Sequence, residues 1–297
     1  MRVRILGSAA GGGFPQWNCA CPNCRGVRDG SIRARSRTQA SVALSVDDEH
    51  WYLLGASPEI RSQLESFPAL NPRAARHTPI EAIFLTNGDL DHTLGLLSLR
   101  EWSRITVYAT DPVRDAFCSG NVLNRALQRF EGHSRWLPLE PGVACELQAG
   151  LRVEPVLVAG KSPLYAPQAA GDAPWTVGLK FTHDGRSCGF FPSVARIDAA
   201  LCAALQGLDL VLFDGTLWSD SELIDLGLAN VTGRQMAHVC VGGSEGSLAQ
   251  LQRVDIGRRV YIHINNTNPM LREDSSEAAA VRAAGWSIAE DGQELVV

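Results

Sequence analysis

The 297-residue chain lacks the features that would indicate a membrane or a nucleic acid as its setting. No run approaches the ~18 consecutive apolar residues that a membrane helix needs. The first ten residues hold only a short apolar stretch, which Arg4 interrupts, so they do not resemble a signal peptide. A net charge of -5 gives no basic excess for binding phosphates. We therefore expect a cytoplasmic protein that neither inserts into a membrane nor binds nucleic acid.

Low-complexity tracts, short repeats and Pro/Ser-rich linkers are also missing, which favours one domain over residues 1–297. Hydrophobic residues make up 45% of the chain and charged residues 20%, as is ordinary for a soluble globular enzyme. Composition carries no information on the oligomeric state.

Hydrophobic periodicity predicts a strand-rich first part and a later part in which strands and helices alternate. Strands are expected at 2–6, 40–46, 51–55, 79–86, 105–110, 151–158, 175–183, 187–193, 208–214, 258–264, 286–290 and 293–297. Helices are expected at 93–102, at 111–130 with an interruption near Gly120, and at 196–206, 247–254 and 275–285. This order is typical of layered α/β architecture with functional loops at strand ends.

The eight cysteines divide into a cluster and five scattered residues. Cys19, Cys21 and Cys24 have C-x-C-x₂-C spacing, which in a reducing compartment favours zinc with a fourth ligand from elsewhere. An iron–sulfur cluster ranks lower because its motifs usually have a wider first gap, and chance clustering in a loop is the remaining alternative. The sequence thus predicts a structural zinc loop at 18–25. The scattered cysteines have apolar neighbours and are expected to be buried, inert thiols: Cys118, Cys145, Cys188, Cys202 and Cys240.

The stretch "TNGDLDH" places Asp91 and His92 side by side after an expected strand. In a turn, both can face one metal, with Asp89 as a third ligand or a base beyond the ligands. The alternative is a helix N-cap formed by Asp91 or Thr93.

Polar residues at later strand ends favour the metal site. Asp214 ends "LVLFD", His238 lies in "MAHV" and His263 lies in "YIHI". Each histidine alone is more often a satisfied core residue than a ligand. The coincidence of all three with Asp91-His92 is what predicts a metal centre.

One other motif points to different chemistry. "GGSEG" matches the G-x-S-x-G pattern of serine hydrolases around Ser244. Ser247 and Gln250 form a capping box, however, which starts the helix too late for Ser244 to be an elbow nucleophile.

Several longer motifs resemble a known superfamily. "LTNGDLDHTLGL" is similar to the H-x-H-x-D-H turn of metallo-β-lactamases, and "LDLVLFDGTLW", "MAHVCVGGSEGSL" and "VYIHINNTNPML" resemble later motifs of the tRNase Z and phosphodiesterase branches. More narrowly, "LGSAAGGGFPQWNCACPNC" and "IHINNTNPML" resemble a family of pyrroloquinoline quinone (PQQ) biosynthesis proteins. The resemblance implies an α/β (α+β) fold, namely a four-layer αββα sandwich.

The resemblance also implies ligands. Members of the superfamily normally hold two metals, but the first two histidine positions fall on Asn87 and Asp89, and a bridging Asp position falls on Ser193. One active-site metal is therefore expected, with ligands from Asp91, His92, Asp214 and His263. The fourth ligand of the cysteine zinc site corresponds to Asn266.

For function, the resemblance implies an Fe(II)- and O₂-dependent oxygenase that hydroxylates the tyrosine ring of a small, peptide-derived Glu-Tyr precursor. Asp89 or His238 would move protons. Arg33 and Arg35 would hold substrate carboxylates, unless their loop is merely a solvated surface. The alternatives are a two-metal hydrolase of the phosphodiesterase type and a carrier that binds PQQ or its precursor for transport without chemistry.

Overall fold

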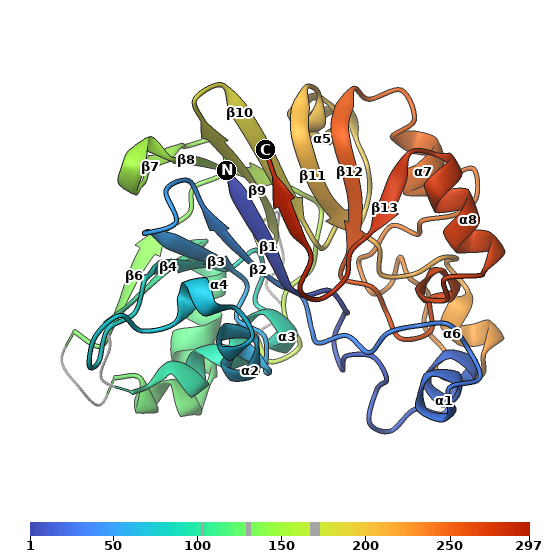
Figure 1. The fold of residues 1–297 in the computed structure, drawn as a ribbon, viewed down its shortest axis with the longest axis horizontal. Helices are drawn as coiled ribbons and strands as arrows, with labels where there is room; N and C mark the ends of the chain where they lie inside the picture. The colour runs from blue at the N-terminus through green and yellow to red at the C-terminus, as the bar shows by residue number, and fades with distance from the viewer. Residues whose placement is uncertain (102–103, 129–131, 167–172) are drawn as a thin grey trace.

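The computed structural model describes residues 1–101, 104–128, 132–166 and 173–297. Two mixed, seven-stranded sheets pack face to face, and helices cover their outer faces (Figure 1). The first sheet has the order β14 (Glu294–Val296), β1 (Arg2–Gly7), β2 (Ser41–Ser45), β3 (Trp51–Leu54), β4 (Ile80–Phe84), β5 (Ile105–Ala109) and β6 (Ser134–Pro138). The second has the order β13 (Trp286–Ile288), β12 (Ile256–Ile262), β11 (Leu208–Asp214), β10 (Arg186–Phe191), β9 (Val177–His183), β8 (Arg152–Leu157) and β7 (Cys145–Glu146).

The helices are short. The α-helices are α1 (Pro22–Asp29), α2 (Ile60–Glu65), α3 (Leu90–Thr93), α4 (Asp111–Asp115), α5 (Ala199–Leu205), α6 (Glu222–Asp225), α7 (Ser247–Gln250) and α8 (Ser276–Ala283). Single 3₁₀ turns are η1 (Pro68–Leu70), η2 (Leu94–Leu99), η4 (Val122–Ala126), η5 (Gln148–Gly150) and η6 (Pro269–Leu271), and η3 (Ala116–Gly120) is a π turn.

Three hydrophobic layers explain why the chain forms four layers of secondary structure. In β11, Leu210 and Leu212 face the other sheet, whereas Val211 and Phe213 face the outer layer that contains α5 and α8. In β4, Phe84 likewise points inward and its neighbours point toward α2. Strands buried on both faces need continuous apolar runs, and each large side chain that is fully buried contributes roughly 1.5–3 kcal/mol. The predicted αββα sandwich is confirmed.

The parallel strands place their carboxyl ends together, and this edge carries the polar segments. Strands β3 to β6 run parallel in one sheet and β10 to β13 in the other. Segments that follow β4, β10, β11 and β12 hold the polar residues predicted to act together. Ligands of open α/β sheets typically bind outside the carboxyl ends of the strands.

All twelve predicted strands are present, with shifts of a few residues at their ends. The short β6 and β7 were not predicted, and neither was α1, which makes part of the predicted cysteine loop helical.

The helix predictions were less accurate. Within the helix predicted at 93–102, Leu94–Leu99 form a 3₁₀ helix instead, because Gly95 packs so closely on Ala56 that its N–H donates to the Ala56 carbonyl. At 111–130 a short helix passes into π and 3₁₀ turns, and residues 102, 129 and 130 lie outside the described part. The predicted capping box is wrong, since Gly246 caps α7 and the Ser247 hydroxyl bonds Tyr261.

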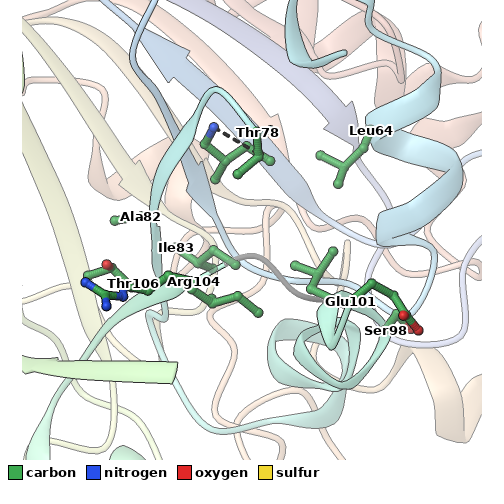
Figure 2. A pocket seen from close by; sticks show the side chains of 11 residues that line it. Leu64, Thr78, Ala82, Ile83, Ser98, Glu101, Arg104 and Thr106 are labelled. Atoms are coloured by element: carbon green, nitrogen blue, oxygen red, sulfur yellow. Dashed lines mark hydrogen bonds between the residues drawn. The ribbon is translucent and has the colours of Figure 1, made fainter. Parts of the chain in front are cut away.

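An apolar pocket of about 170 Å³ lies between α2 and the outer face of the first sheet (Figure 2). Leu64, Ile80 and Ile83 are among its lining residues, and none of the lining residues belongs to the polar strand-end segments. The helices of the described residues all fall short of the length and hydropathy that crossing a membrane requires.

Candidate metal centre

The turn after β4 presents Asp91 and His92 at the first turn of α3. Asn87 Oδ1 accepts a hydrogen bond from the Asp89 N–H (3.0 Å), which folds the turn, and Asp89 occupies the N-cap position without a side-chain cap bond. Asp91 and His92 therefore lie inside the helix rather than capping it. Their side chains face one another, with His92 Nε2 3.7 Å from Asp91 Oδ2.

His263 reaches the same place from the second sheet. It follows β12, and its Nε2 lies 2.9 Å from Asp91 Oδ2. Its φ of 59° falls in the left-handed region, which a residue other than glycine adopts only when its surroundings enforce it. Here the Ile264 N–H donates to the Ser8 carbonyl and the Asn265 N–H to the Thr216 carbonyl, fixing the turn on both sides.

Three imidazole rings lie in a row. His263 stacks on His92 with ring centroids 5.1 Å apart, and on His238 with centroids 5.3 Å apart. His92 and His263 are buried, whereas the His238 side chain is 13% exposed. The row therefore runs from the interior toward solvent.

The electrostatics around Asp91 favour a cation. Burial lowers the pKa of His92 to about 4. Burial would also raise the pKa of Asp91, but the charges of His92 and His263 and the hydrogen bond with His263 outweigh it and hold the pKa below its usual range. For His263, burial favours the neutral ring, yet the hydrogen bond and charge of Asp91 raise its pKa overall.

These three residues fit a single metal ion. Their ligand atoms lie within 4.8 Å of one another. Both ring nitrogens of His92 are buried without a hydrogen-bond partner among the described residues, which for an imidazole is a sign of a missing ligand. One carboxylate and two imidazoles form a donor set that Fe, Zn and related metals accept.

Asp214 and His238 form a second, adjoining group. Asp214 Oδ2 lies 2.7 Å from His238 Nδ1 and accepts the Val194 N–H, while Oδ1 accepts the N–H and hydroxyl of Thr216. The charge of His238 and these bonds outweigh burial and lower the pKa of Asp214. Its ligand atoms and those of His238 and His263 also lie within 4.8 Å. With four protein donors on its oxygens, Asp214 is better suited to orient His238 than to bind metal, and its role as a ligand stays a prediction.

The positions that would form the first metal site of the superfamily contact each other instead. Asn87 Nδ2 donates to Ser193 Oγ at 3.2 Å, and both residues are buried. Burial, together with the charge of Asp91, raises the pKa of Asp89, while Lys161 acts in the opposite direction. Asp89 therefore lies within electrostatic reach of the cluster, as a proton-moving group would need to.

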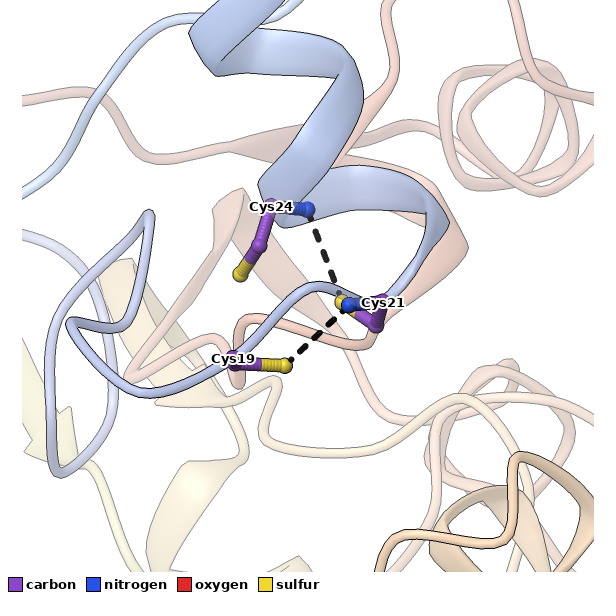
Figure 3. A group of neighbouring side chains, drawn as sticks. All are labelled: Cys19, Cys21 and Cys24. Atoms are coloured by element: carbon purple, nitrogen blue, oxygen red, sulfur yellow. Dashed lines mark hydrogen bonds between the residues drawn. The ribbon is translucent and has the colours of Figure 1, made fainter.

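The predicted cysteine cluster also comes together (Figure 3). The three sulfurs lie within 4.8 Å of one another, and Asn266 Nδ2 lies 3.3 Å from Cys19, 3.7 Å from Cys21 and 3.2 Å from Cys24. Burial raises the pKa of Cys21 to about 12. Burial acts in the same direction on Cys19, but hydrogen bonds with Cys21, Cys24 and Asn266 outweigh it and lower the pKa of that thiol. A flip of the Asn266 amide would present Oδ1 to a metal, so the set fits zinc with three thiolates and one amide oxygen.

The other residues for which the sequence predicts a role or an environment lie on the surface and in the core. Arg33 and Arg35 are exposed and pair with Glu273 and Glu290. Within the described residues no contact joins either arginine to the acid–histidine cluster, and their role in substrate binding stays a prediction. Cys188 is buried as predicted, but burial was wrong for four half-buried cysteines: Cys118, Cys145, Cys202 and Cys240.

Sequence reasoning missed Thr216, whose hydroxyl lies between Asp214, His238 and His263. The only local signal is its position two residues after Asp214. It also missed the loop that includes Lys161 and Tyr165, where the Tyr165 hydroxyl donates to the Gly88 carbonyl at 2.6 Å.

Comparison with known proteins identifies the family. The beta-lactamase superfamily domain matches residues 50–264. The chain is 44% identical over 300 residues to coenzyme PQQ synthesis protein B of Methylorubrum extorquens (strain PA1), and 43% identical over 302 residues to that of Azotobacter vinelandii, with 99% of each chain covered in both cases. A crystal structure of zinc-bound PqqB from Methylobacterium extorquens superposes with a TM-score of 0.94 at 42% identity, covering 100% of both chains. A diphosphatase of the PhnP family, at 21% identity and a TM-score of 0.71 over 100% of this chain and 97% of that one, shares the fold.

The fold and the strand-end site thus define a metallo-β-lactamase-type domain. Within that superfamily, the chain belongs to the coenzyme PQQ synthesis protein B family.

Proposed function

We propose that this protein acts in PQQ synthesis as an Fe(II)- and O₂-dependent hydroxylase of the tyrosine ring in a peptide-derived Glu-Tyr precursor. The relatives' shared name supports the pathway. The observation that carries the chemistry is the buried His92 ring beside Asp91 and His263, whose two nitrogens have no hydrogen-bond partner among the described residues. Two histidines and one carboxylate with open positions are the donor set of non-haem Fe(II) oxygenases.

The reaction balances with an external reductant. One atom of O₂ replaces a ring hydrogen as a hydroxyl group, and the other leaves as water, taking two protons and two electrons from a reductant of the ascorbate type. Bound Fe(II) would supply the activation of O₂. Asp91, His92 and His263 would hold the metal.

The protein's own acid–base groups are His238 and Asp89. Asp214 fixes His238 through Nδ1, so Nε2 is directed away from that bond and is available to exchange a proton with the ring hydroxyl. Asp89, with its raised pKa, is a second group that can hold a proton near the cluster.

We also propose that the cysteine cluster holds structural zinc. Cys19, Cys21, Cys24 and Asn266 form a closed set that leaves no position for water, which suits folding rather than catalysis. The zinc in the related PqqB structure supports metal binding in the family. A reducing cytoplasm would keep the thiols available.

The test is O₂ consumption by anaerobically Fe(II)-loaded protein, with ascorbate and a Glu-Tyr-containing peptide precursor. We expect O₂ uptake coupled to a product heavier by one oxygen atom, and ¹⁸O₂ should label that atom. His92→Ala should abolish the coupled uptake, while His183→Ala, which replaces a histidine on β9 outside the cluster, should not. Turnover that survives His92→Ala would reject this site.

A two-metal hydrolase is the second candidate, because Asp214, His238 and His263 also lie close enough to share a metal. It requires two metals per chain besides the cysteine zinc, and anaerobic cleavage of a phosphodiester or amide with Zn²⁺ or Mn²⁺. A carrier would bind the precursor without consuming O₂. Either result would overturn the hydroxylase proposal.

A further inference from the structure

The Thr216 hydroxyl has more polar neighbours than it can bond equally. Its Oγ1 lies 2.7 Å from Asp214 Oδ1, 2.8 Å from His263 Nδ1, 3.0 Å from the His263 carbonyl and 3.1 Å from His238 Nδ1. A hydroxyl carries one proton and two lone pairs. The assignment of that proton decides which histidine nitrogens carry hydrogen.

Thr216 is held rigidly in this position. Its N–H donates to Asp214 Oδ1 at 3.0 Å, and its carbonyl accepts the Asn265 N–H at 3.0 Å. Gly215 permits the turn, because a Cβ there would lie 2.9 Å from Tyr261 Cβ and 3.2 Å from the Ile262 carbonyl. Residue 216 is thereby brought back over the end of β11.

The Thr216 hydroxyl donates its hydrogen bond to Asp214. That carboxylate oxygen is both the nearest and the charged acceptor, and charge-assisted bonds are the stronger ones. If Thr216 instead donated to His263 Nδ1, its oxygen would face Asp214 Oδ1 at 2.7 Å with lone pairs on both atoms. The lone pairs of Thr216 are therefore free to accept hydrogen bonds from N–H groups.

His263 Nδ1 is the nearest nitrogen donor to those lone pairs. His238 Nδ1 already has Asp214 Oδ2 at 2.7 Å, so it too carries a hydrogen. Both rings then have hydrogen on Nδ1 and direct Nε2 away from Asp214. His263 Nε2 consequently faces Asp91 Oδ2, to which its N–H donates in this structure, and a metal bound between the two atoms would take the place of that proton.

We propose that Thr216 is a positioning residue that links Asp214 to His263 by hydrogen bonds, a link that we call the relay. One carboxylate thereby orients two imidazoles: His238 directly and His263 through the Thr216 hydroxyl. The relay rests on the metal centre proposed above but on neither iron nor O₂. Partners beyond the ligands of a metal typically change its affinity by about 10–100-fold when removed.

Zinc binding without substrate or O₂ tests the relay, so its failure is distinct from failure of the hydroxylase proposal. The protein is first purified with its cysteine site filled, and the affinity for the next zinc equivalent is measured by competition with a chromophoric chelator. Thr216→Val keeps the shape but removes the hydroxyl, and should weaken this affinity about 10–100-fold. Thr216→Ser keeps the hydroxyl and should stay within about threefold of the parent by the same reasoning.

A spectroscopic measurement separates the relay from loose packing. In the zinc-loaded parent, the hydrogen-bonded His263 Nδ1–H should give a downfield, slowly exchanging proton resonance. Thr216→Val should shift that resonance upfield, Thr216→Ser should restore it, and the His238 resonance should change little in either variant. Parent-like zinc affinity in Thr216→Val, equal losses in both variants, or an unchanged His263 resonance would each overturn the proposal.

Discussion

His263 and Asn266 lie three residues apart in the turn after β12, and each reaches a different candidate metal site. His263 Nε2 lies 2.9 Å from Asp91 Oδ2, whereas Asn266 Nδ2 lies 3.2 Å from Cys24 Sγ. This segment is also fixed from the cysteine side, where Asn23 donates to the carbonyls of Asn266 and Asn268. Loosening the cysteine cluster should therefore displace His263.

Cys21→Ser should release one zinc and lower the melting temperature, because binding energy at a closed thiolate site is folding energy. Activity should fall only as far as this loosening explains. Cys202→Ser, which changes a half-buried cysteine outside the cluster, should do neither. Elemental analysis and calorimetry measure both effects. Zinc loss without a change in melting temperature would contradict the structural role, and full stability with no turnover would place these thiols in the chemistry.

The triple variant Asn87→His, Asp89→His and Ser193→Asp should bind one metal more than the parent. It replaces the Asn87–Ser193 contact with the ligand types that normally form the first site of the superfamily. Equilibrium dialysis against Zn²⁺, followed by elemental analysis, counts the metals. Asn87→His alone is the control and should add none, since one ligand cannot hold an ion there. If the folded triple variant binds no more metal than the parent, residues other than these three must also differ from those that form the first metal site in the superfamily.

His238→Gln should keep the metal and lose turnover. His238 contacts Asp214 and Thr216 rather than Asp91, so metal content should stay at the parent level. Loss of a proton-moving group typically lowers kcat about 10²–10⁴-fold. Steady-state kinetics on protein of measured metal content is the test. Loss of the metal together with activity would instead make His238 a ligand.

Glu222→Gln should change how stability depends on pH. Glu222 is 6% exposed, and burial raises its pKa above the ordinary 4.5, although bonds from Thr267 and the Trp218 N–H oppose this. Between 4.5 and that raised value the folded state binds more protons, so this group makes the parent less stable as pH rises through the window.

Urea unfolding at pH 4 and pH 7 tests this sign. The free energy of unfolding of Glu222→Gln, taken relative to that of the parent, should be higher at pH 7 than at pH 4. Glu65→Gln, at the exposed end of α2, is the control, and its free energy of unfolding should differ from the parent's by the same amount at both pH values. A Glu222→Gln difference that is independent of pH, or that reverses, would show that burial does not dominate.

The sequence predicted what local patterns encode. The run Leu208–Asp214 indicated a buried strand because both faces of β11 are covered. The residues of both candidate sites were identified because they follow strands or lie within a few positions of one another. Helix η2 was mispredicted despite helical spacing, since its form depends on the contact of Gly95 with Ala56. Thr216 was missed because the two histidines that it contacts lie 22 and 47 residues away, and its position two residues after Asp214 forms no pattern by itself.

The two candidate sites differ in how far apart along the chain most of their residues lie. Their ligands therefore become available at different times during synthesis. Three of the four proposed zinc ligands, Cys19, Cys21 and Cys24, leave the ribosome almost together and can bind an ion while most of the chain is still unmade, whereas Asn266 joins them only late in synthesis. Asp91 must wait for His263, 172 residues later, and for both sheets to dock. On the proposal made above, the nascent chain would take its zinc first, and the acid–histidine centre would be loaded only from the metals that the finished protein meets. Its occupant is set by cellular metal supply as well as by its ligands.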